Sequence, residues 1–218
     1  MRARAAFFLL LIGATYAHAQ DFSFDADLRA SGWQTVSFPG IAPVLFSAHA
    51  GTLEVAADSA AGLLWRALKA PRPAPATAQW SWRVEEGIRP TDLTRRGEDD
   101  RALAVYFVFG KTSDAAKGPM ALLSASATRA LVYVFGGSGP RSTLLSSPHM
   151  GERGKFIILR PATGPKRQWL PESVDLKADY VRAFGELPGQ LLAIAISSDS
   201  DDTRGRNRAQ LRGLRIDR

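Results

Sequence analysis

The chain has 218 residues, a formal net charge of +7 and no cysteine. The lack of cysteine excludes disulfides, thiol catalysis and zinc sites built from cysteine ligands. The positive charge, which includes six arginines between Arg204 and Arg218, favours contact with anionic polymers of a cell envelope or with lipid head groups.

The first 19 residues have the pattern of a signal peptide. Arg2 and Arg4 precede a short apolar run, and Ala17 and Ala19 provide the small residues of a cleavage site. The run is shorter than the roughly 20 residues that a membrane span needs. We therefore expect export to the periplasm or the medium, a mature chain that starts at Gln20, and no transmembrane span in that mature chain. Export also argues against nucleic acid as a partner.

The mature chain, residues 20–218, has the pattern of short strands. The segment 79–84 alternates cleanly, so that Trp80, Trp82 and Val84 share one face. The segment 101–109 is apolar on both faces, which is typical of a central strand covered on both sides. A second buried strand is expected at 191–196. Further strands are expected at 33–38, 43–48, 52–56, 62–68, 120–126, 130–135, 142–147, 155–159, 169–174 and 209–216.

Clusters of Gly, Pro and Ser separate these segments, as they do in hairpin-rich folds. Helix is expected only as about one turn at 179–185, which Gly185 and Pro188 stop. About a dozen short strands with little helix predict an all-β fold. We expect a single-domain antiparallel β-sandwich of the jelly-roll or concanavalin-like kind over residues 20–218.

The order of several residues resembles that of a known family. The residues that carry the resemblance are Trp80, Trp82, the Asp-Asp pair before a Val-Tyr-Phe strand, Tyr133, Trp169, Asp179, Tyr180 and the run Asp-Ser-Asp-Asp-Thr at 199–203. This order is similar to that of the bacterial exported family known as domain of unknown function 3047. The resemblance implies a jelly-roll or concanavalin-like sandwich and an exported protein. It implies no activity, because none is established for the family.

Two groups of aspartates flank the two most apolar strands. Asp99 and Asp100 precede the segment 101–109, whereas Asp199, Asp201 and Asp202 follow the apolar run near the C-terminus. If the two strands are antiparallel neighbours, the start of one lies beside the end of the other. Carboxylates are the hard oxygen ligands that calcium prefers. These five aspartates are therefore the candidate metal site, with calcium as the possible cofactor.

Two other roles for the aspartates stay open at this point. Arginines near them in the sequence could neutralise them: Arg95, Arg96 and Arg101 for the first group, and Arg204, Arg206 and Arg208 for the second. Two of the carboxylates could instead act as acid and base in glycoside cleavage. A serine triad is not supported, because the sequence has no Gly-x-Ser-x-Gly motif.

The aromatic side chains form a second candidate site. Trp80, Trp82, Tyr106, Tyr133 and Trp169 are candidate ligand-binding residues, because flat rings bind the apolar faces of sugars. The alternative is that the tryptophans fill the core between two sheets, as large alternating side chains do in sandwiches.

Small residues on the two apolar strands predict a shallow groove if the strands are neighbours: Ala102 and Ala104 on one, Ala193 and Ala195 on the other. Together these patterns favour an exported binding module for a glycan or a related anionic envelope polymer. One alternative is a polysaccharide hydrolase or lyase that uses the aspartates of the acidic turns. Another is a structural or protein-partner module.

Overall fold

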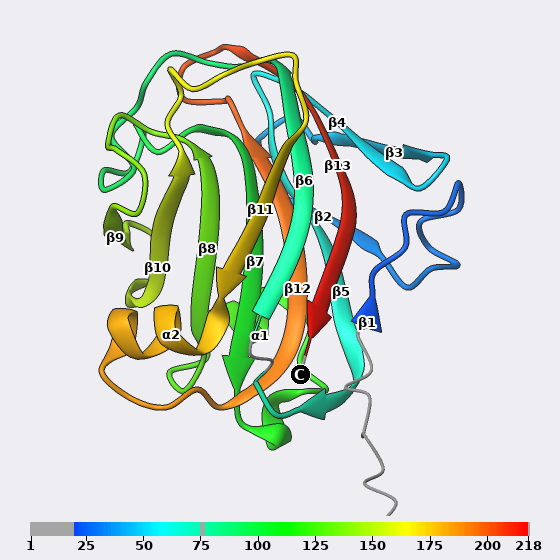
Figure 1. Ribbon diagram of the computed structural model, residues 1–218, viewed down its shortest axis with the longest axis vertical. Coiled ribbons are helices and arrows are strands. Elements are labelled where there is room, and N and C mark those ends of the chain that lie inside the picture. The colour runs from blue at the N-terminus through cyan, green and yellow to red at the C-terminus, as the bar shows by residue number, and fades with distance from the viewer. Residues whose placement is uncertain (1–19, 75–76, 218) are drawn as a thin grey trace, which may run out of the picture.

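The computed structural model describes residues 20–74 and 77–217, which form two β-sheets packed face to face (Figure 1). The all-β sandwich expected from the sequence is confirmed. The predicted signal peptide lies outside the described residues. Within those residues, no helix is long and apolar enough to cross a membrane.

One sheet has six strands, and all of its pairs are antiparallel. Its order is β11 (Leu170–Asp175), β6 (Thr77–Glu86), β13 (Arg206–Asp217), β4 (Thr52–Asp58) and β3 (Leu45–His49), with β1 (Gln20–Asp21) also paired to β13. The N-terminal strand of the described chain therefore lies beside the C-terminal one.

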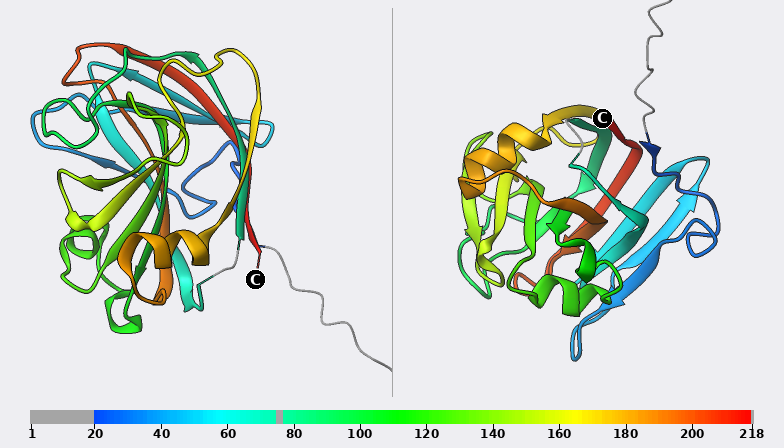
Figure 2. Two further views of the ribbon diagram at one scale, coloured as in Figure 1. Left: turned by 60° about the vertical axis from the view of Figure 1, so that its left-hand side comes forward. Right: turned by 90° about the horizontal axis from the view of Figure 1, so that it is seen from below.

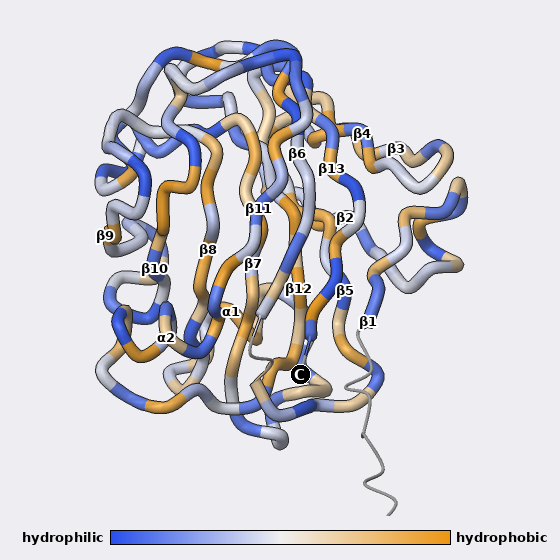
Figure 3. The backbone as a smooth tube through the Cα atoms, in the orientation of Figure 1, coloured by the Kyte–Doolittle hydropathy of each residue, from blue (hydrophilic) through white to orange (hydrophobic). Residues whose placement is uncertain are grey.

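The other sheet has seven strands. Its order is β2 (Gln34–Ser37), β5 (Ala61–Arg72), β12 (Gln190–Asp199), β7 (Arg101–Gly110), β8 (Arg129–Gly136), β10 (Gly151–Arg160) and β9 (Leu144–Ser147). Its strand pairs are antiparallel with one exception, the parallel pair β8 and β10. Figure 3 shows that apolar residues concentrate on the central strands of the molecule and hydrophilic residues in the loops at the top.

The described residues contain two short α-helices and one 3₁₀ turn (Thr112–Asp114). α2 (Leu176–Phe184) lies where a helical turn was expected but is longer, because Asp175 caps its start and Gly185 ends it in a left-handed conformation. It lies at the lower end of the sandwich (Figure 2). The strand expected at 120–126 is wrong: α1 (Pro119–Ser124) occupies that position. Proline in the first turn is compatible with a helix start, and a short apolar run does not by itself distinguish helix from strand.

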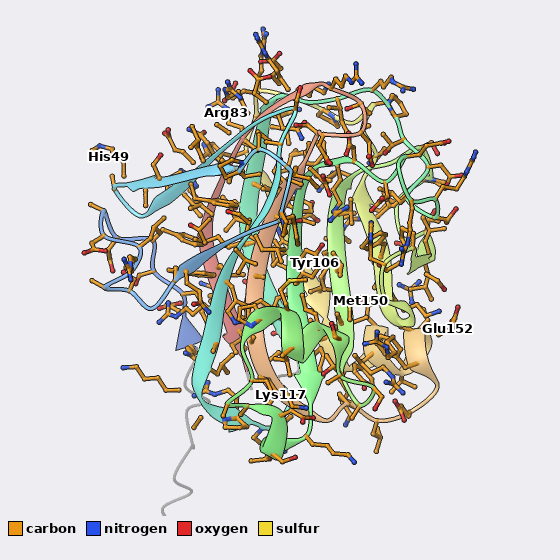
Figure 4. The ribbon with its side chains drawn as sticks, turned by 180° about the vertical axis from the view of Figure 1, so that it is seen from behind. His49, Arg83, Tyr106, Lys117, Met150 and Glu152 are labelled. Carbon is orange, nitrogen blue, oxygen red and sulfur yellow. The ribbon has the colours of Figure 1, made fainter. Side chains whose placement is uncertain are left out.

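Two apolar layers pack on the seven-stranded sheet, one on each face. Strand β7 contributes to both, since all of its residues are buried. Val105 and Phe107 point into the core between the sheets, while Tyr106 and Val108 point to the outer face. The outer layer includes Leu122 of α1, so this helix covers part of that face (Figure 4). The prediction of a central strand covered on both sides is confirmed.

Aromatic rings fill the middle of the core between the sheets. The ring centroid of Trp80 lies 5.5 Å from that of Trp82, 6.2 Å from Phe107 and 5.6 Å from Tyr133. Trp80 is only 2% exposed, and its indole N–H has no hydrogen-bond partner among the described residues. Its contribution to stability is therefore that of a large apolar side chain.

We predict that Trp80→Ala lowers the free energy of unfolding by about 3–5 kcal/mol, because it leaves a large cavity in the core. The matched control is Trp169→Ala, which removes a half-buried ring stacked by Arg212 at 4.0 Å. That change should cost no more than about 1 kcal/mol. Urea unfolding of both variants measures the difference; equal losses would contradict the assignment of Trp80 to the core.

Candidate functional site

The two acidic turns meet at one edge of the seven-stranded sheet. Strands β7 and β12 are antiparallel neighbours, and Asp199 pairs with Arg101 in the register. Asn207 of β13 fixes this edge, because its buried amide donates to the backbone carbonyls of Arg101 (3.2 Å) and Asp199 (2.9 Å). The meeting predicted from an antiparallel arrangement is confirmed.

A buried arginine lies at the centre of this edge. The Arg101 side chain is 7% exposed, and its Nη1 lies 3.3 Å from a carboxylate oxygen of Asp99 and 3.3 Å from one of Asp199. Its Nη2 donates to the Tyr106 hydroxyl at 2.8 Å, and its guanidinium lies over the Phe156 ring at 5.2 Å. Although burial opposes the charge, Tyr106 and the two aspartates together raise the pKa of Arg101 above its usual value.

The two aspartates that pair with Arg101 differ in ionisation. Burial opposes ionisation of Asp99, but a 3.2 Å contact with the His149 ring and the Arg101 charge outweigh it and lower the Asp99 pKa. Burial raises the pKa of Asp199 to about 9; Arg101 opposes the rise, and Asp201 adds to it. The pKa values of the two carboxyls are therefore shifted in opposite directions.

The other three aspartates form a separate group. Carboxylate oxygens of Asp100, Asp201 and Asp202 all lie within 4.8 Å of one another. Within the described chain, none of the three forms a salt bridge. Asp100 is fully buried; one of its oxygens accepts the Thr203 N–H at 2.7 Å, and the other has no hydrogen-bond partner. The five aspartates predicted as one metal site therefore divide into a pair held by Arg101 and a triad.

The arginine pairing expected from the sequence is correct only for Arg101. Arg95 pairs with Glu98, and Arg206 pairs with Asp58. Arg208 donates to backbone carbonyls instead of to an acidic side chain. Sequence proximity misled here because Arg95 lies in a loop beside Glu98, whereas Arg206 and Arg208 belong to β13 in the other sheet.

A cavity of about 520 Å³ opens beside Arg101 on the outer face of the seven-stranded sheet. One end is polar, and the remaining wall is largely apolar. Its lining includes Asp99, Arg101, Tyr106, His149, Asp199, Asp201 and Asp202 at the polar end, and Phe38, Ile41, Leu63, Met120, Leu123, Met150 and Phe156 elsewhere. Figure 4 shows Tyr106 and Met150 on this face, near α1.

The predicted aromatic platform does not form, because its members lie in three places. Trp80, Trp82 and Tyr133 are in the core between the sheets, where no ring face is open to a ligand. Trp169 lies beside β13, with the Arg212 guanidinium over its ring. Tyr106 alone lines the cavity.

The groove predicted over four alanines is also wrong. Ala102, Ala104, Ala193 and Ala195 are all buried within the packed layers. An irregularity in the pairing of β7 and β8 near Arg101 turns Ala102 into the core between the sheets. The small residues that do line the cavity include Ala61, Gly62 and Ser197.

The sequence analysis named Arg101 only as one of several arginines near the aspartates, not as the buried centre of the site, and it missed His149, which contacts Asp99. One signal was present for Arg101, since it is the only charged residue in a strand that is otherwise apolar on both faces. A charge in such a position needs a buried counterion. No comparable signal marked His149, which a loop from β9 to β10 brings to Asp99.

The sequence matches the family described as "Protein of unknown function (DUF3047)" over residues 31–215. No curated protein matches it.

Solved structures with a distant likeness include proteins that act on or bind polysaccharides. The xyloglucanase domain of the effector NopAA from Sinorhizobium fredii is 12% identical, with 93% of this chain and 96% of that chain covered and a TM-score of 0.46. A cellulase derived from Cel12A of Rhodothermus marinus is 14% identical, with coverages of 93% and 94% and a TM-score of 0.45. The family 11 carbohydrate-binding module of Clostridium thermocellum is 8% identical, with coverages of 90% and 94% and a TM-score of 0.45. Likenesses this distant assign no function to the chain.

The raised pKa of Asp199 predicts a pH dependence of stability. The unfolded carboxyl loses its proton near pH 3.9, whereas the folded one keeps it up to about pH 9. Folding therefore takes up a proton in this window, and the contribution of Asp199 to stability falls as pH rises. We predict that Asp199→Asn flattens the decline of the unfolding free energy between about pH 5 and pH 8. Urea unfolding across that range measures the unfolding free energy at each pH. If this free energy falls with pH equally in wild type and Asp199→Asn, the raised pKa of Asp199 is contradicted.

Proposed function

Because the chain belongs to the DUF3047 family, whose function is unknown, we propose its role from the site itself: an exported module that binds a glycan of the cell envelope in the cavity beside Arg101. The observation that carries this proposal is the combination of an apolar wall and a fixed polar end in one cavity. Its volume of about 520 Å³ is in the usual range for ligand pockets.

The two parts of the cavity suit the two parts of a sugar. A pyranose ring has apolar C–H faces, which pack against side chains such as Met120 and Phe156. Its hydroxyls need oriented acceptors and donors, which Asp99 and His149 supply. Arg101 holds Asp99 and Tyr106 in place, so the polar end is ordered before the ligand binds. Binding therefore costs little side-chain entropy at this end.

The charge of the lining favours a neutral glycan. Four aspartates line the cavity, against two arginines. Arg101 is already paired with two of these aspartates, and Arg153 donates to the backbone carbonyls of Leu123 and Ala125. In the ion-free site, an anionic polymer, which the net charge of the chain suggested, would meet uncompensated carboxylates. The proposal is therefore for neutral sugars with free hydroxyls.

We predict that Ser124→Trp blocks ligand binding. Ser124 is an exposed residue at the end of α1 that lines the cavity, so an indole there fills the entrance without disturbing the core. Ser126→Trp is the matched control, because Ser126 is exposed on the same connection but does not line the cavity.

The measurement is a screen of the mature protein against neutral envelope glycans, followed by calorimetry on the glycans that bind. Affinity should fall at least about tenfold in Ser124→Trp, which corresponds to a loss of 1.4 kcal/mol, and stay unchanged in the control. Equal affinities for the two variants would place the ligand elsewhere.

Glycoside hydrolysis is a second candidate, favoured by the divergent ionisation of Asp99 and Asp199. A protonated carboxyl beside an ionised one is the acid–base arrangement that glycosidases use. Because each carboxylate has an oxygen 3.3 Å from the same Arg101 nitrogen, these two oxygens are at most twice that distance apart. A glycan bound at this end would therefore contact both groups.

The hydrolase candidate predicts release of reducing ends from a bound glycan. Asp199→Asn and Asp99→Asn should each lower that rate at least about 100-fold, because each removes an acid or base. Binding should persist in Asp199→Asn, since the amide keeps the shape of the carboxyl. If wild type binds a glycan but leaves it intact, the hydrolase candidate is wrong and the binding module remains the proposed function.

A further inference from the structure

The triad Asp100, Asp201 and Asp202 is not explained by the glycan site. Asp100 is 0% exposed and precedes β7, whereas Asp201 and Asp202 lie in the loop between β12 and β13. The fold holds carboxylate oxygens from all three within 4.8 Å of one another. Three like charges at such a distance repel one another unless something neutralises them.

Asp100 provides a separate reason to expect a ligand. A buried carboxylate normally has hydrogen-bond donors for both oxygens, because water is excluded from them. The Thr203 N–H donates a hydrogen bond to one oxygen of Asp100 at 2.7 Å. The other oxygen is buried and has no partner among the described residues. The side chain that carries this unpartnered oxygen is the buried member of the triad with Asp201 and Asp202.

No described basic side chain fills this position. Arg101 is occupied by the other two aspartates, Asp99 and Asp199. Arg206 pairs with Asp58 at the end of β4, and Arg95 pairs with Glu98.

We propose that the triad of Asp100, Asp201 and Asp202 binds a calcium ion. Calcium takes six to eight oxygen ligands in irregular arrangements, and three carboxylates with water supply such a set. Magnesium demands a near-ideal octahedron, which a triad from two separate loops is not built to provide.

The position of Asp202 gives the ion access from solvent. This residue is exposed, and it lines both the cavity beside Arg101 and a neighbouring hollow of about 320 Å³. Thr91 and Thr203 also line that hollow and add hydroxyl oxygens near the triad. The ion would tie the loop before β7 to the loop after β12. This inference stands whether or not the cavity binds a glycan, because its test needs no glycan.

The experiment is thermal unfolding and calorimetry of the mature protein with calcium chloride or with chelator. Bound calcium stabilises the folded state, and at a hundredfold excess over Kd the midpoint should rise by roughly 5–10 °C for a domain of this size. Magnesium chloride at the same concentration should raise it much less.

Two variants test the residues. Asp202→Asn and Asp201→Asn should both lose the calcium response, and each should unfold at a higher temperature than wild type in chelator, because repulsion within the triad is relieved. Both positions are outside the core, so the variants are expected to fold. The control Glu85→Gln removes the same charge from β6 at a residue that lines neither the cavity nor the neighbouring hollow, and it should keep the full response.

The proposal would be overturned by a wild-type midpoint that millimolar calcium leaves unchanged. It would also be overturned if both aspartate variants kept the calcium response, or if magnesium stabilised the protein as strongly as calcium.

Discussion

Burial of the Arg101 guanidinium is the constraint on which the edge of the seven-stranded sheet depends. Taking an ion of this size out of water costs several kcal/mol, and the cost is recovered only with well-placed partners. Asp99, Asp199 and Tyr106 are those partners, and they come from the start of β7, the end of β12 and the outer face of β7. Removing any one of them leaves a charge or a polar atom unpaired in the interior. The loops on both sides of the sheet edge are therefore held in one arrangement.

This arrangement divides the acidic residues by role. Asp99 and Asp199 are bound to Arg101 and face the cavity, where they can orient a ligand. The triad around Asp100 lies next to them without a cation of its own. The two features are coupled because Asp201 and Asp202 also line the cavity. A calcium ion in the triad would then help to fix the same rim that a glycan contacts, which would make ligand binding sensitive to calcium.

The sequence predicts the fold and part of the site, and the limits have physical causes. The segment around Val105 is apolar on both faces, which identifies a central strand, and its antiparallel pairing with β12 brings the acidic turns together. The alternation at Trp80 and Trp82 shows that their rings share one face of the strand, but not whether that face points to the core or to solvent. A core position and a ligand platform therefore give the same sequence pattern. The segment around Met120 forms a helix where the sequence predicts a strand, because a short apolar run is compatible with either element. The cavity itself depends on how α1 and the loop to β10 cover the sheet, which no local pattern encodes.

The most direct test of the central claim, that the cavity beside Arg101 is the ligand site, uses methionine methyl groups. The chain has three methionines, and the two that follow Met1, Met120 and Met150, both line this cavity. In mature protein labelled with carbon-13 at the methionine methyl, NMR therefore reports on the cavity with two signals. A glycan that calorimetry shows to bind should shift both signals in a saturable way, with the same Kd as the calorimetric one. Saturating glycan that leaves both signals unmoved would contradict the account.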